Sequence, residues 1–131
     1  MKFKPHHIAF TVKNLQQTIN WYENNLGFKV LTEYEKKGVK KALLQLDEVL
    51  IELFDNGENT KLLPNYRKTV ADDLQVIGTK HIGIEVEDLY ELVKSLQKKG
   101  VEVQEIKPVS FGGICTFITD CNGILIELYQ K

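Results

Sequence analysis

The chain has 131 residues, which suits a single domain that buries about two-thirds of its unfolded surface and builds its own core. Its 43% hydrophobic and 27% charged residues are typical of a globular protein, and a net charge of −1 creates no field that would draw it to nucleic acid or to an anionic membrane. No apolar run approaches the ~20 residues of a membrane span and no secretory signal is recognisable, so we expect neither nucleic-acid nor membrane partners.

Cysteine and arginine usage adds two expectations. Cys115 and Cys121 are too few for a disulfide framework, so we expect two reduced thiols in a cytoplasmic protein. Arg67 is the single arginine among the 17 basic residues. Bidentate clamping of a carboxylate or phosphate is characteristic of arginine, so an anionic substrate would depend on lysines, backbone N–H groups or a metal.

The first half of the chain predicts the element order β-α-β-β-β. Residues 7–12 alternate apolar and polar side chains, as in a strand with one face on a core. Asn14 can cap a following helix, which should end at Gly27, where a C-cap glycine is expected. Three further strands are predicted, over residues 28–34, 41–46 and 49–54.

The second half predicts the same order. Residues 81–86 alternate like 7–12, and Asp88 can cap a helix whose apolar residues follow the spacing i, i+3, i+4, i+7. Gly100 stands at the expected end of this helix. Strands are predicted over residues 101–106, 114–119 and 124–129, with an Asn-Gly turn between the last two.

The two halves are copies of one pattern. His7-Ile-Ala-Phe-Thr-Val-Lys-Asn-Leu matches His81-Ile-Gly-Ile-Glu-Val-Glu-Asp-Leu at an offset of 74 (81 − 7), and Glu52 matches Glu127 at an offset of 75 (127 − 52). Internal repeats of this kind define a structural unit. We therefore predict an α+β fold with two βαβββ modules that form a cupped mixed sheet in a single domain, residues 1–131. The modules span about 5–55 and 80–131, and the polar residues 56–79 are interpreted as a linker.

Strand parity places the repeated histidines and glutamates on corresponding faces. Because the apolar residues of 7–12 pack beneath the helix, His7 projects from the opposite side of its strand, and the same parity applies to His81. The apolar neighbours of Glu52 face the helix, so Glu52 points away from it, as does Glu127 in the second module. If the two sheets pair side by side, these four side chains line one cup and converge.

Two imidazoles and two carboxylates suit one divalent metal, Zn²⁺, Ni²⁺, Co²⁺, Mn²⁺ or Fe²⁺. Two neighbouring carboxylates without a cation would repel each other in a low-dielectric site. His6 has the opposite parity and no counterpart in the repeat, so it is not expected to bind metal. The predicted ligands are His7, Glu52, His81 and Glu127.

These motifs resemble the vicinal oxygen chelate superfamily, which includes glyoxalase I, bleomycin-resistance proteins and extradiol dioxygenases. The resemblance covers nearly the whole chain. It rests on the two His-containing motifs, on Trp21-Tyr22 followed by Leu26-Gly27-Phe28, on Leu50-Ile51-Glu52-Leu53, and on Asp120-Cys121-Asn122-Gly123-Ile-Leu-Ile-Glu127-Leu.

A His and a Glu in both modules is most similar to glyoxalase I, which isomerises the hemithioacetal of methylglyoxal and a thiol such as glutathione. The resemblance implies that a metal-side glutamate, Glu127 or Glu52, removes the proton next to the carbonyl while the metal stabilises the enediolate. Thr11 and Phe54 share the helix-free face, and Phe111 belongs to the loop 107–113; these three residues are the predicted substrate contacts. Relatives pair modules within one chain or between two, so a homodimer is an open alternative.

Other members of the superfamily supply alternative functions. An enzyme similar to methylmalonyl-CoA epimerase would use comparable proton chemistry on a thioester, although such enzymes typically have Gln at the position of Glu52. Iron dioxygenases and thiol transferases acting on fosfomycin resemble the chain but bind metal through three residues. A metal-free protein that sequesters a ligand, of the bleomycin-resistance type, would lack the metal-binding residues. In every case the partner implied is a small molecule, and an enzyme would need two adjacent oxygens on its substrate.

Overall fold

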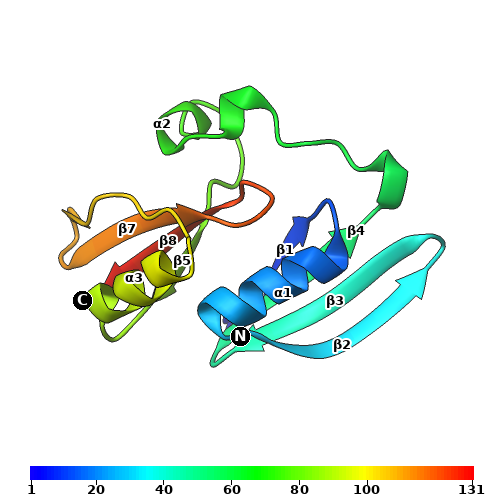
Figure 1. The fold of residues 1–131 in the computed structure, drawn as a ribbon, viewed down its shortest axis with the longest axis horizontal. Coiled ribbons are helices and arrows are strands. Elements are labelled where there is room, and N and C mark those ends of the chain that lie inside the picture. The colour runs from blue at the N-terminus through cyan, green and yellow to red at the C-terminus, as the bar shows by residue number, and fades with distance from the viewer. The chain divides into compact units, whose positions relative to one another are not determined.

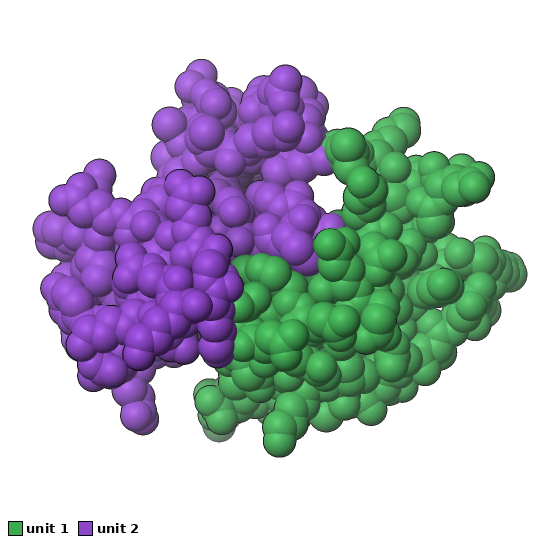
Figure 2. Space-filling model, viewed as in Figure 1, with its two compact units in different colours: residues 1–62 green, residues 63–131 purple.

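The computed structural model describes all residues, 1–131, and the chain falls into two compact units, Met1–Leu62 and Leu63–Lys131 (Figure 2). Each unit holds one four-stranded mixed sheet and one main helix (Figure 1). The predicted α+β class with two βαβββ modules is therefore confirmed. No helix of the chain is long and apolar enough to cross a membrane.

The first unit has the strand order β1-β4-β3-β2. Strands β1 and β4 are parallel, whereas β2, β3 and β4 form antiparallel pairs. A 3₁₀ turn, η1, follows the last strand at Gly57–Asn59. The elements of the module are β1 (Ile8–Thr11), α1 (Leu15–Leu26), β2 (Lys29–Lys36), β3 (Val39–Leu46) and β4 (Val49–Asp55).

The second unit repeats this topology with the order β5-β8-β7-β6, and β5 is parallel to β8. Two short helical segments precede its module, namely η2 (Asn65–Arg67) and α2 (Val70–Asp73). The elements of the module are β5 (Ile82–Glu85), α3 (Leu89–Lys98), β6 (Lys107–Pro108), β7 (Ile114–Thr119) and β8 (Leu125–Gln130).

Helix α1 begins and ends where the sequence predicts. The side chain of Asn14 accepts a hydrogen bond from the backbone N–H of Gln17 at 2.9 Å, which satisfies one of the free donors of the first turn. Gly27 ends the helix with φ of 87°, a left-handed conformation that glycine adopts without strain. Tyr22 lies on the buried face of α1, and its ring packs edge-on against Phe28 with centroids 5.4 Å apart.

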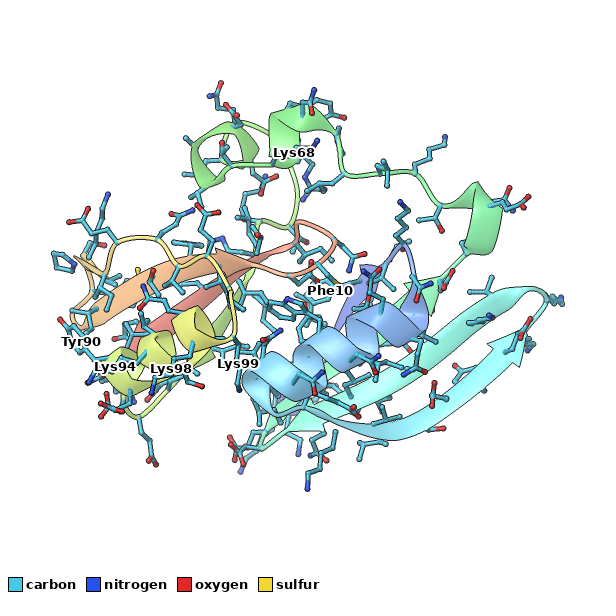
Figure 3. The ribbon with its side chains drawn as sticks, in the orientation of Figure 1. Phe10, Lys68, Tyr90, Lys94, Lys98 and Lys99 are labelled. Atoms are coloured by element: carbon cyan, nitrogen blue, oxygen red, sulfur yellow. The ribbon has the colours of Figure 1, made fainter.

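Helix α3 has the same construction. Asp88 accepts a hydrogen bond from the N–H of Glu91 at 3.0 Å, and Leu89 and Leu96 are fully buried against the sheet side. Burial of each such side chain contributes about 1.5–3 kcal/mol. The exposed face carries residues spaced by four, as Figure 3 shows along the helix: Tyr90, Lys94 and Lys98.

One predicted strand is wrong. Residues 101–106 form no ladder, and the edge strand β6 is limited to Lys107–Pro108. Gln104 is hydrogen-bonded to β7: its backbone N–H donates to the carbonyl of Phe117 at 3.1 Å, and its carbonyl accepts from the Thr116 hydroxyl at 2.6 Å. Alternating side chains indicate burial but not hydrogen bonding, and this segment leads into the edge strand β6, which pairs with β7 over two residues only.

The segment interpreted as a linker has structure of its own, and the division between the units falls within it. Asp73, which is 2% exposed, accepts a hydrogen bond from Arg67 Nε at 2.7 Å and lies 3.7 Å from Lys80 Nζ. Arg67 also donates to the carbonyl of Thr79 at 2.9 Å, and Lys80 donates to the carbonyls of Asp73 and Val76. The single arginine therefore binds within the segment 63–80.

Candidate functional site

In the first unit, His7 and Glu52 lie next to each other on the helix-free face of the sheet. His7 directly precedes β1, and Glu52 stands in the middle of β4, in register with Ala9. The neighbours Ile51 and Leu53 are fully buried on the helix side, so the predicted parity of Glu52 is confirmed. His7 Nε2 and Glu52 Oε1 are 3.8 Å apart, with side chains 40% and 29% exposed.

The second unit holds the equivalent pair in a tighter contact. His81 Nε2 lies 2.9 Å from Glu127 Oε2, within hydrogen-bond distance, and the two side chains are 23% and 18% exposed. Glu127 is in register with Gly83 on β5 and with Phe117 on β7. The Phe117 ring stands edge-on to the His81 imidazole with centroids 4.9 Å apart, so it limits the orientations that His81 can adopt.

Each pair offers one imidazole nitrogen and one carboxylate oxygen, the donor types that borderline divalent metals accept. Protein sites for such metals use three or four residues as ligands. One pair supplies only two ligands. Within each unit, no group of three or more His, Cys, Asp or Glu residues is arranged to hold a metal.

His6 contacts His7, although the sequence assigns it no ligand role. The Nδ1 atoms of the two rings are 2.8 Å apart, and the rings meet edge to face at 5.0 Å. One of these nitrogens must carry the proton and the other accept it. This contact engages Nδ1 of His7 and leaves its Nε2 directed to Glu52, which is the arrangement found when an outer partner orients a ligating histidine.

Cys115 is a neighbour of Glu127 that sequence reasoning missed. Burial, the charge of Glu127 and a hydrogen bond with its carboxylate raise the pKa of the Cys115 thiol. Cys115 also forms no disulfide. Cys115, Phe117 and Thr119 alternate along β7, so the period of two was the signal that could have placed Cys115 on the face of Glu127.

The predicted substrate residues Thr11 and Phe54 occur side by side, in register across the parallel pair β1 and β4. The same row continues through Lys41 on β3 to Tyr34 on β2. Lys41 Nζ lies 5.2 Å from the centroid of the Phe54 ring and 5.4 Å from that of Tyr34. Both contacts are within the range of cation–π attraction.

The third predicted substrate residue, Phe111, lies in the second unit and is 74% exposed. Its ring is 5.5 Å from that of Tyr129, and the Tyr129 hydroxyl donates a hydrogen bond to the carbonyl of Gly112 at 2.9 Å. Tyr129 occupies the repeat position of Phe54. The loop is thus attached to β8 beside Glu127, while the contact of Phe111 with substrate remains a prediction.

Comparison with known proteins identifies the family and the fold of the chain. The family model "Glyoxalase/Bleomycin resistance protein/Dioxygenase superfamily" matches residues 4–128. A solved structure of a glyoxalase family protein from Enterococcus faecalis has a TM-score of 0.81 and 29% identity, covering 96% of both chains.

Two curated relatives are enzymes. Methylmalonyl-CoA epimerase from Dictyostelium discoideum is 28% identical over 98% of this chain and 78% of its own length. Lactoylglutathione lyase from Neisseria meningitidis serogroup A is 28% identical over 95% of this chain and 88% of its own length. The chain belongs to the glyoxalase/bleomycin resistance protein/dioxygenase superfamily.

Proposed function

We propose that His7, Glu52, His81 and Glu127 together bind one divalent metal, Zn²⁺, Ni²⁺, Co²⁺, Mn²⁺ or Fe²⁺, and that the chain is a glyoxalase I-like lyase. The observation that carries the proposal is the repetition of one His–Glu pair at equivalent positions of both units. Each pair lies on the helix-free face and supplies two donors. The two pairs can come from one chain or from two copies in a homodimer.

The proposed reaction moves one proton within a hemithioacetal formed from methylglyoxal and a thiol such as glutathione. A metal in this site would supply Lewis-acid stabilisation for the two adjacent oxygens of the substrate. A glutamate removes the proton from the carbon that bears sulfur and hydroxyl and returns it to the neighbouring carbonyl carbon. The product is a thioester with a hydroxyl on that neighbour, so no oxidant or reductant is consumed.

Glu52 is our preferred base. Its nearest partner, His7, is 3.8 Å away, whereas Glu127 is engaged by His81 at 2.9 Å and by the Cys115 thiol. A base must shift toward the substrate carbon, and the carboxylate with fewer short contacts moves at lower cost. In this assignment Glu127 and His81, which are less exposed than Glu52 and His7, remain bound to the metal.

The test combines metal content with activity. Protein purified without chelator should contain about one transition metal per chain, and it should isomerise the hemithioacetal of methylglyoxal and glutathione. Glu52→Gln and Glu127→Gln should each lower metal content or reduce turnover by about 10²-fold or more, the scale of a lost general base. Glu48→Gln is the matched control, because Glu48 lies exposed in the turn before β4. Failure to take up any of the five metals would overturn the proposal.

A second candidate follows from the relative that is a methylmalonyl-CoA epimerase. Epimerisation removes and returns a proton at one carbon beside a thioester carbonyl, so a glutamate base and the same metal would serve it. Assaying the metal-loaded protein with methylmalonyl-CoA in deuterated water separates the candidates. Deuterium incorporation there, without hemithioacetal turnover, would favour the epimerase.

A further inference from the structure

A row of four side chains crosses the helix-free face of the first unit beside Glu52. The ladder register aligns Thr11 of β1, Phe54 of β4, Lys41 of β3 and Tyr34 of β2. Phe54 and Lys41 are half-buried, while Thr11 and Tyr34 are exposed. The row therefore presents a hydroxyl, an aromatic ring, an ammonium group and a phenol in sequence to the same side of the sheet.

Lys41 is held in this row without an acidic partner. Its ammonium group lies over both the Phe54 and the Tyr34 ring, and its contacts include no carboxylate within 4.0 Å. Two aromatic neighbours remove part of the water around the charge, which strengthens its attraction for an anion. Because it has no ion-pair partner, the ammonium group of Lys41 is available to an anionic ligand.

The other basic residues lack this combination. Of the sixteen lysines, only Lys41 and Lys80 are not exposed. Lys80 is engaged by Asp73 and by backbone carbonyls. Arg67 is bound to Asp73 and to the Thr79 carbonyl. Lys41 is consequently the one basic side chain that is partly buried, positioned by packing and free of an ion pair.

The row also lies close to the proposed chemistry. Phe54 and Glu52 are two residues apart on β4, on the same face, which corresponds to about 7 Å along the strand. Lys41 is in register with Phe54 and hence diagonal to Glu52. A substrate whose reacting carbons lie at Glu52 could therefore extend a charged group to Lys41 over a few bonds.

We propose that Lys41 and Tyr34 form a subsite, with Phe54 as its floor, for a compact anionic group on the substrate. The group is a carboxylate or a phosphate, because lysine acts as a point charge that accepts either one. Tyr34 adds a hydroxyl donor on the strand next to Lys41, and Thr11 lies beyond Phe54 at the other end of the row. The proposal that this subsite binds an anion depends only on these contacts. The proposal that the bound anion belongs to a substrate of the enzyme rests on the proposed function.

The first test follows backbone amide signals of the apo protein by NMR while succinate or inorganic phosphate is added. Shifts should concentrate at Thr11, Tyr34, Lys41 and Phe54, and they should weaken as salt is added. Lys41→Met, which keeps the length of the side chain, should raise the dissociation constant about tenfold or more, as expected for loss of one charged hydrogen bond. Lys41→Arg should retain binding.

Lys40→Met is the matched control, since Lys40 is exposed and belongs to the other face of β3. It should leave the dissociation constant unchanged. Equal loss in Lys40→Met and Lys41→Met, or shifts that avoid this row, would overturn the subsite. Stronger binding of succinate identifies a carboxylate tail, and stronger binding of phosphate identifies a phosphorylated one.

A second test connects the row to the metal site. Butyrohydroxamate and the monohydroxamate of succinic acid both present two adjacent oxygens, and they differ in one remote carboxylate. The metal-loaded protein should bind the succinic compound about tenfold more tightly, and Lys41→Met should abolish this preference. Amide shifts at the row without hydroxamate binding would retain the subsite and reject the metal-dependent function. If the protein binds both hydroxamates equally well, the subsite does not contribute to substrate binding at the metal site.

Discussion

At the scale of single residues, two adjacent glycines allow the cost of backbone strain to be compared with the cost of a steric clash. Gly112 and Gly113 both have left-handed conformations, with φ of 97° and 83°. A Cβ atom on Gly112 would meet nothing within 4 Å, whereas a Cβ on Gly113 would collide with the carbonyl oxygen of Gln130 and the Tyr129 ring. Gly113 thus permits the close approach of the 109–113 loop to β8.

Gly113→Ala should therefore destabilise the protein more than Gly112→Ala. A left-handed alanine costs about 1–2 kcal/mol in either position, and the overlap with a backbone carbonyl adds a further cost of about 1–3 kcal/mol at Gly113. The measurement is the free energy of unfolding in urea for both variants. Equal losses would show that the loop moves aside readily, which contradicts close packing on Tyr129.

The positions of single side chains were predictable where the repeat exposed them and unpredictable where they depend on register. His7, Glu52, His81 and Glu127 follow from parity within each strand. The placement of Lys41 between Phe54 and Tyr34 requires the cross-strand register of three strands. That register depends on the turns between the strands and on the shift between Val30 and Thr32, which no local pattern indicates.

At the scale of elements, the capping residues were the main basis for predicting where the helices begin and end. Asn14, Gly27 and Asp88 each act as the sequence indicates, because caps act through hydrogen bonds between residues only three to five positions apart. The segment 63–80 could not be predicted in the same way. Its order comes from the buried carboxylate of Asp73, and polar composition alone indicates a loop.

Asp73 should make the stability of the second unit depend on pH. A hydrogen bond from Arg67, opposed by burial and helped by the charges of Arg67 and Lys80, lowers the pKa of Asp73 from its ordinary value of 3.8. The unfolded chain therefore takes up this proton at a higher pH than the folded chain. The stabilisation is complete above the pKa of the unfolded chain and disappears as the pH falls through the lower folded pKa.

Asp73→Asn should cost about 1–3 kcal/mol near neutral pH, the scale for a hydrogen bond to a charged group, and progressively less as the pH falls through the lowered pKa of folded Asp73, because the protonated carboxyl is neutral like the amide. Urea unfolding across this pH range provides the measurement. Asp72→Asn is the matched control, since Asp72 is the exposed neighbour on α2. Because Lys80 directly precedes His81, the Asp73 variant should also weaken metal binding. A loss of stability that stays constant with pH would exclude an ionised Asp73 as its cause.

At the scale of the whole molecule, the repeat distributes one His–Glu pair to each unit. The fold class follows from this repeat, because two similar modules with the same element order need the same sheet topology. The number of metal ions does not follow from it. Two pairs could bind one ion jointly or two ions separately, and these arrangements differ in how substitutions in the two units combine.

A double-mutant cycle with Glu52→Gln and Glu127→Gln distinguishes them. If one ion needs all four residues, each single variant should lose most of the stabilisation by metal, which is about 2.7 kcal/mol for the unsubstituted protein at a metal concentration of 100 times the dissociation constant. The double variant should then lose little more than either single variant. Substitutions at sites that do not interact would instead add.

The cycle is measured as free energy of unfolding with and without metal, together with metal content per chain. Without metal, the two single variants should unfold alike, within about 0.5 kcal/mol of the unsubstituted protein, because Glu52 and Glu127 are both partly exposed. A non-additive cycle with one ion per chain requires both units to bind the same ion. Additive losses with two ions per chain would mean that each pair binds alone, and the four-residue site would be rejected.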